Sequence, residues 1–431
     1  VNKITTVSEF YLKRFGPMCS NIYSWVMLVA YVLVFMVPVL YGGSLAFSML
    51  TGFDFYFVLW LTVILVGMYT IKGGLLSVMW TDFLQCAFLV GGGLVLFLIS
   101  LSYIPGGWSA MVQAAPERFH LYRPPGDKMA PFIGIILLAV NLGVFYQATN
   151  QVMIQRIFAA KSTRDGMLGM IFAGFINFIR PCVTVFLGFV VYHWINKMGN
   201  AEPLSKADEA FPFALKTFAP AWGLRGIVLA GFLAAIMSTI SSLVNSIATI
   251  FALDVYKKIH PQAPDKTIIR SGQLVAALSL IIAGLMAPMI EHFGGIFKYF
   301  QTGVTYLATP FACIYIMGLF WKRTNYAGAI FGLVGGFIIT ILLVIGLNLA
   351  DIELHWAYVG AIVQVLTILG IIIVSLMTAP PPESQWKPFL WRPSMLRQYN
   401  EGGKKTPWYK TITFWYAMYA AIWFYVYWRF W

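Results

Sequence analysis

Long runs of apolar residues without charge recur along the whole chain, and they constrain its fold more than any other feature. A helix needs roughly 20 residues to cross the hydrocarbon core of a bilayer. Because lipid offers no hydrogen-bond partner to the backbone, continuous runs of this length predict transmembrane helices rather than strands. We predict about eleven spans, at 20–49, 53–71, 81–101, 131–155, 166–194, 223–253, 270–290, 296–320, 327–348, 356–378 and 411–428.

The low content of charged residues is typical of a membrane protein. Charged residues make up 10% of the chain, against roughly 25% in soluble domains, which excludes an ordinary cytosolic enzyme, a coiled coil and a disordered scaffold. The net charge of +13 falls on alternate segments between the spans, beginning with that of Lys13 and Arg14. The positive-inside rule therefore predicts a cytoplasmic N-terminal end and an outside C-terminus, in a plasma or inner membrane, and no nucleic-acid partner is needed to explain the charge.

The chain divides into three parts in sequence. Residues 1–378 form a transmembrane core with its following helices, 379–410 a cytoplasmic linker that opens on three prolines, and 411–431 a C-terminal transmembrane helix. Glycines recur every four residues in one span, which favours close helix packing; they are Gly328, Gly332 and Gly336. The histidines and cysteines show no spacing typical of a metal or catalytic site, so we predict no enzyme and no organic cofactor.

Span 223–253 is the richest in intramembrane polar residues, which are costly and therefore point to function. At 100° per residue its hydroxyls and amides form one stripe, made of Ser238, Ser242, Asn245 and Thr249, with Ser241 beside it. Small hard cations take oxygen ligands of this kind. Serine and threonine also let helices approach closely, so the pattern alone leaves an ion site and a packing face open.

Two charged residues lie within or at the edge of predicted spans. Asp82, with Gln85 three residues later, fits a helix N-cap at the inner end of its span. Arg180 lies in mid-span, one turn after Asn177. An intramembrane arginine normally faces a cavity or an acid, so a structural ion pair and a contact to a solute both remain open.

Several stretches, in this order, resemble the sodium:solute symporter family and most closely its sodium/glucose branch. The first four are TVSEF at 6–10, KRF at 13–15, YTIKGGL at 69–75 and WTDFLQ at 80–85. They are followed by NQVMIQR at 150–156, AAK at 159–161, AAIMST at 234–239 and NS at 245–246. The last are Thr249, DVY at 254–256 and GLFWKR at 318–323. Together they extend over most of the chain.

The resemblance implies an all-α LeuT-like core of two inverted repeats, of which this chain holds core helices three to ten, plus additional C-terminal helices. About three helices that precede this part in the family, including the first core helix, are absent from the chain. It further implies sodium-coupled symport of a small polar solute, a sugar or polyol, across the lipid bilayer, with one or two sodium ions. A non-transporting membrane subunit or sensor on the same fold is the alternative, and subunit partners are not identified.

Site residues are carried over from the family by position. One sodium site is implied at oxygens of Ala235, Ser238 and Thr239, and a second at Asp82, Ser241 and Ser242. The solute site is implied at Tyr146, an inner gate, with Gln147, Asn177, Arg180 and Gln301. Gln147 and Asn177 replace a tryptophan and a lysine of close relatives, so we expect a solute that differs from glucose, and an acidic one is included.

Overall fold

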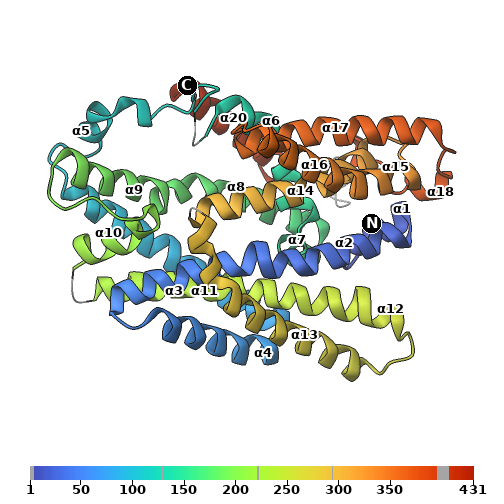
Figure 1. Ribbon diagram of the computed structural model, residues 1–431, viewed down its shortest axis with the longest axis horizontal. Helices are drawn as coiled ribbons and strands as arrows, with labels where there is room; N and C mark the ends of the chain where they lie inside the picture. Colours follow the sequence, from blue (N-terminus) through green and yellow to red (C-terminus); the bar gives the residue numbers. More distant parts are fainter. Residues whose placement is uncertain (1–3, 128–129, 221–222, 294, 396–406) are drawn as a thin grey trace.

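The chain folds into a bundle of helices. The computed structural model describes residues 4–127, 130–220, 223–293, 295–395 and 407–431, without the side chains of 72–77 and 224. Every regular element in these ranges is a helix, and most of the long helices run along the longest axis of the molecule (Figure 1). The helices of the first half are α1 (Val7–Phe15), α2 (Pro17–Ala30), η1 (Tyr31–Met36), α3 (Val37–Thr51), α4 (Phe55–Ser102), α5 (Gly107–Ala114), η2 (Pro116–Arg118), α6 (Phe132–Val144), η3 (Phe145–Thr149), α7 (Gln151–Phe158), α8 (Thr163–Val183), α9 (Val185–Tyr192) and η4 (His193–Lys197).

The second half continues the same pattern, with short π-helical turns inside several spans. Its helices are η5 (Ala207–Glu209), α10 (Ala210–Phe218), α11 (Leu224–Thr249), η6 (Ile250–Tyr256), α12 (Lys257–Ile259), α13 (Asp265–Met286), η7 (Ala287–Phe293), α14 (Ile296–Phe320), α15 (Tyr326–Ile330), η8 (Phe331–Gly335), α16 (Gly336–Leu349), α17 (Trp356–Met377), α18 (Glu383–Trp386), η9 (Trp408–Lys410) and α20 (Ile412–Arg429).

Nine helices in the described part are long and apolar enough to cross a membrane. They coincide with nine of the eleven predicted spans and are Pro17–Thr51, Val78–Ser102, Phe132–Thr149, Thr163–Lys197, Arg225–Ile259, Asp265–Phe293, Ile296–Phe320, Tyr326–Leu349 and Trp356–Met377. The other two predicted spans are also helical: Phe55–Ile71 is a shorter apolar helix, and 411–428 corresponds to α20, whose tyrosines and tryptophans make it less apolar.

Two predicted spans, 53–71 and 81–101, share α4, which is helical over its whole length rather than divided by a loop. The two arms of α4 pack against different helices. Gly67 and Gly284 mark contacts of the first arm with the antiparallel α13, while Gly92 and Gly231 mark contacts of the second arm with the antiparallel α11.

The predicted span 131–155 is broken. The helix α6–η3 ends at Thr149, Asn150 adopts an extended conformation (φ −89°, ψ 114°), and α7 starts at Gln151. The break lies within a short polar stretch of the apolar run, formed by Gln147, Thr149, Asn150 and Gln151. Broken helices within a membrane occur where the chain is buried in protein or lines a cavity.

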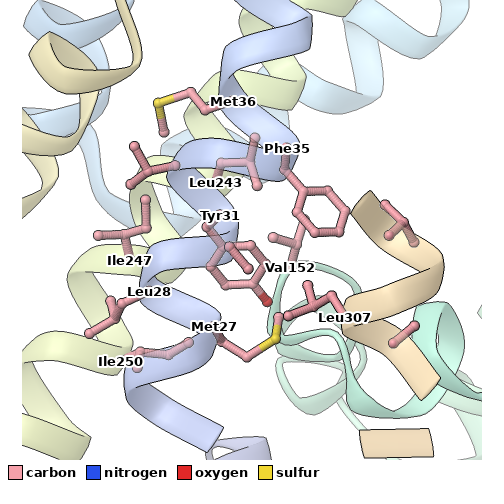
Figure 2. Close-up of a cluster of buried hydrophobic side chains, with 14 of the residues drawn as sticks. Met27, Leu28, Tyr31, Phe35, Met36, Val152, Leu243, Ile247, Ile250 and Leu307 are labelled. Carbon is pink, nitrogen blue, oxygen red and sulfur yellow. The ribbon is translucent and has the colours of Figure 1, made fainter. Parts of the chain in front are cut away.

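The main hydrophobic core surrounds the first span. Side chains of α1, α2, η1 and α3 pack there against α11, α13 and α14. Figure 2 shows its centre, where Tyr31 of η1 lies among apolar side chains from α11, η6, α7 and α14. The predicted glycine face is confirmed: a Cβ on Gly332 would lie 2.6 Å from Ile314 of α14 and 2.8 Å from Ile371 of α17.

The short helix α1 and its N-cap form hydrogen bonds with three other helices, η6, α7 and α14. The Thr6 hydroxyl donates to Asp254 at the end of η6 over 3.1 Å, and the Val7 amide donates to the Gln151 side chain over 3.0 Å. Arg14, fully buried, donates from Nε to the carbonyl of Gly318 near the end of α14. Burial lowers the pKa of Arg14 to about 10, which leaves the guanidinium charged at neutral pH.

Candidate functional site

The polar stripe on α11 is largely satisfied within its own helix. Thr239 donates to the carbonyl of Ala235 over 2.9 Å, and Ser242 and Ser241 both donate to the carbonyl of Ser238 over 2.6 and 3.0 Å. This is the usual back-bonding of hydroxyls in a helix. Ser238 differs, because its hydroxyl leaves the helix and donates to a carboxylate oxygen of Asp82 over 2.5 Å.

Asp82 is the acid at the centre of the site. It lies inside the second arm of α4 rather than at a helix start, so the prediction of an N-cap is wrong, since the helical turn before it is complete. Its second oxygen forms an ion pair of 2.5 Å with Arg156 of α7. The Arg156 guanidinium also donates to the Ser242 hydroxyl and, over 2.6 Å, to the carbonyl of Val152.

Three helices therefore meet at one charged cluster, formed by Asp82, Arg156, Ser238 and Ser242. The side chains of Arg156 and Asp82 are 30% and 16% exposed. An intramembrane acid needs such a partner, because burying an unpaired charge is expensive. Arg156 was not among the predicted site residues, although it ends the quoted stretch at 150–156; its position just beyond a predicted span concealed its role.

The atoms that would bind the ion in the predicted sodium sites are all oxygens, which suit a small hard cation. Of the first predicted set, Ser238 bonds to the acid, while Ala235 and Thr239 lie at the accessible side of α11, with Thr239 exposed. Of the second set, Asp82 and Ser242 are joined through Arg156, and Ser241 is buried with its hydroxyl on its own helix. No group of three or more His, Cys, Asp and Glu side chains within the described residues could hold a metal ion.

The predicted gate lies directly before the break in the α6–α7 span. Tyr146 and Gln147 belong to η3, where Tyr146 is partly buried and Gln147 is exposed. The break itself is buried and held by hydrogen bonds from the first span: Tyr23 donates to the carbonyl of Thr149 over 2.6 Å, and Tyr31 donates to the side chain of Asn150 over 2.8 Å. Neither tyrosine stands out in the sequence, because each lies within an apolar run.

The remaining predicted solute residues are spread over two other helices. Asn177 is partly exposed and Arg180 exposed on α8, and Arg180 forms no ion pair with any acid in the described ranges. The expectation of an intramembrane acid partner for Arg180 therefore finds no support. Gln301 lies partly buried near the start of α14. The structure thus brings the charged cluster together, but no described hydrogen bond joins one of the five predicted solute residues to another.

A model of the sodium:solute symporter family matches residues 1–336. The chain is 35% identical over 353 residues to a sodium/glucose cotransporter of Vibrio parahaemolyticus, covering 77% of this chain and 65% of that protein. It is 28% identical over 442 residues to a sodium/myo-inositol cotransporter of Bos taurus, covering 89% and 61% respectively. The chain therefore spans less than two thirds of the length of these relatives.

Among solved structures, the fold resembles that of a sodium-coupled sialic acid symporter in a substrate-bound, outward-open state, with a TM-score of 0.71 and 22% identity over 88% of this chain and 78% of the other. The predicted fold class, an all-α polytopic membrane protein with a LeuT-like core, is confirmed. Symporters are transporters, so the prediction that the chain is no enzyme agrees with the matched family.

Proposed function

The chain belongs to the sodium:solute symporter family, and on that premise we propose that it takes part in sodium-coupled symport of a small polar solute by alternating access. The observation that carries this proposal is the charged cluster between α4, α7 and α11. Its acid and hydroxyls lie in helices that are otherwise apolar, and such groups mark ion pathways. Symporters of related architecture bind their ions at the interface of two repeats that rock against each other.

We assign one or two sodium ions to the oxygens of the site. The first ion takes the carbonyl of Ala235 and the hydroxyls of Ser238 and Thr239. The second takes Asp82, Ser241 and Ser242, and its arrival requires the Arg156 guanidinium to give up part of its contact with Asp82 and Ser242, because one carboxylate cannot serve both cations fully. Each ion that crosses the membrane inward contributes about 2.3 kcal/mol per 100 mV.

We assign the solute to side chains of η3, α8 and α14. Tyr146, Gln147, Asn177 and Gln301 offer hydroxyl and amide groups, which suit a neutral sugar or polyol, while Arg180 would suit an acidic sugar. The named relatives act on glucose and myo-inositol, and the solved symporter on sialic acid. These three compounds are therefore the first to test.

The proposed topology places the N-terminal end in the cytoplasm and Trp431 outside, in a plasma or inner membrane, with 379–410 as a cytoplasmic linker. One contact supports the side assigned to the C-terminus: His120, in a loop predicted to be outside, lies 2.8 Å from the carbonyl of Trp431. The two segments consequently share a side of the molecule, as the alternation of spans requires.

The test is sodium-dependent binding and uptake by the full natural protein in proteoliposomes. Ser238→Ala and Thr239→Ala each remove a proposed sodium ligand and should abolish most of the sodium dependence. Thr340→Ala is the matched control, because Thr340 makes the same bond to the carbonyl four residues earlier, over 2.8 Å, but lies in α16 away from the site. Unchanged sodium dependence in both site variants would refute the ion assignment.

A non-transporting subunit or sensor is the second candidate, and the ion pair of Arg156 with Asp82 favours it, since Arg156 occupies one oxygen of a proposed sodium ligand. That function predicts solute binding without sodium-driven accumulation. Uptake against a gradient by the wild-type protein would exclude it.

A further inference from the structure

The break at Asn150 creates polar groups in an apolar region. Asn150 leaves the helical conformation, so the carbonyl of Thr149 lacks the regular helical partner and α7 begins with free amides. The side chain of Asn150 caps one of them by accepting from the Val152 amide over 3.0 Å. Lipid supplies no hydrogen bonds, so the other groups at the break need partners within the protein.

Two tyrosines from the first span supply these partners. Tyr23 donates its hydroxyl to the carbonyl of Thr149 over 2.6 Å, and Tyr31 donates to the same Asn150 oxygen that caps α7, over 2.8 Å. Tyr23 and Tyr31 are both 0% exposed and Asn150 is 2% exposed. Water is therefore excluded, and an unmade bond here would cost the full desolvation of the group.

The ring of Tyr31 is buried in the hydrophobic core. Figure 2 shows it between Ile247 and Ile250 on one side and Val152 and Leu307 on the other. Ile247 belongs to α11, the helix that carries the serine stripe, and Val152 belongs to α7, whose Arg156 reaches the acid. One side chain thus contacts the helix with the ion ligands and the start of the half-helix that follows the gate.

We propose that Tyr23 and Tyr31 are positioning residues for the gate. Their hydroxyls fix the break at Thr149–Asn150 and thereby set where η3, with Tyr146, lies relative to α11. The role of the gate rests on the proposed function, whereas the hold on the break does not. Sodium on α11 then acts on the gate through α2–η1, because Tyr31 lies beside Ile247 of α11 and bonds to Asn150 at the break.

The variants Tyr23→Phe and Tyr31→Phe remove only the hydroxyls. Tyr11→Phe is the matched control, because Tyr11 is equally buried and its hydroxyl donates to the carbonyl of Phe311 rather than to a group of the break. Hydrogen exchange of residues 145–154 is measured by mass spectrometry in the full natural protein, with and without sodium. Each site variant should exchange about 5- to 150-fold faster in this segment, because it leaves a buried acceptor without its tyrosine donor.

The control should leave exchange in 145–154 unchanged while it alters the segment around Phe311. The sodium concentration that gives half of the full change in exchange should rise in the site variants and stay constant in the control, a shift that loss of stability alone does not produce. Wild-type exchange at 145–154 in both site variants, or acceleration spread evenly over the chain, overturns the proposal. If sodium leaves the wild type unaffected, the proposed function fails, and the exchange without sodium still decides the role of the tyrosines.

Discussion

The first span and the span of α8 are both long and apolar, yet they differ sharply in burial. In the apolar stretch of Pro17–Thr51, 67% of the residues are buried, against 11% in that of Thr163–Lys197. The polar side chains of the two spans also differ in whether they have partners. Tyr23 and Tyr31 of the first span have defined partners, while Arg180 of α8 is exposed and has no acid partner among the described residues.

The role of an intramembrane polar residue must therefore be established differently in the two regions. Where helices surround it, a polar side chain is fixed by its partners, and its role can be read from the contacts. The helix α8 packs against α4, α7 and α20, with Phe175 and Phe178 in aromatic contact with α20, whereas Arg180 is exposed. The roles of Asn177 and Arg180 must therefore be measured by ligand binding rather than by stability.

The largest effect is expected at the partly buried charged cluster. Asp82→Asn leaves the Arg156 guanidinium without its acid and should destabilise the fold by about 3 kcal/mol, the low end of the range for broken buried pairs, since both side chains keep some exposure. Reversible unfolding in mixed detergent micelles measures the change. The double variant Asp82→Asn/Arg156→Gln should lose less than the sum of the single variants. Additive losses would show that the two side chains do not interact.

Two glycines, Gly272 and Gly169, differ in how closely other helices pack against them. A Cβ on Gly272 of α13 would lie 2.6 Å from the carbonyl oxygen of Ala248, a backbone atom that cannot move aside, whereas a Cβ on Gly169 of α8 would meet nothing within 4 Å. Gly272→Ala should therefore destabilise by about 1–3 kcal/mol. Gly169→Ala should be neutral or stabilise by up to about 1 kcal/mol, since alanine favours a helix. Equal effects in the same unfolding assay would contradict the difference in burial.

The sequence predicts the spans well because hydrocarbon thickness and backbone hydrogen bonding fix the length of an apolar helix. It cannot show the pairing of Asp82 with Arg156, which joins residues 74 positions apart in the chain, nor the break at Asn150, which depends on tyrosines from another helix. Asp82 was interpreted as a cap for the same reason: local spacing fits a cap, and only the contact with α11 and α7 reveals its environment.

A smaller effect is expected at the start of α8. Ser162 accepts from the Asp165 amide over 3.1 Å and donates to its carboxylate over 2.7 Å, so it caps a helix that has little burial to stabilise it. Ser162→Ala should cost about 1 kcal/mol, a common value for a lost N-cap. Faster hydrogen exchange confined to the first turns of α8 would confirm that the loss is local, while unchanged exchange there would argue that α20 rather than the cap holds the helix.

The smallest effect on stability is expected at Arg180. Because the side chain is exposed and forms no described ion pair, Arg180→Gln should change the free energy of unfolding by less than about 0.5 kcal/mol. If Arg180 serves solute recognition, the same variant should weaken binding of sialic acid and leave binding of glucose or myo-inositol unchanged, because only the acidic sugar carries a carboxylate for the guanidinium. Equilibrium binding of the three compounds to wild type and variant separates the cases. A large loss of stability would instead place Arg180 in a structural ion pair, and α8 would then resemble the first span after all.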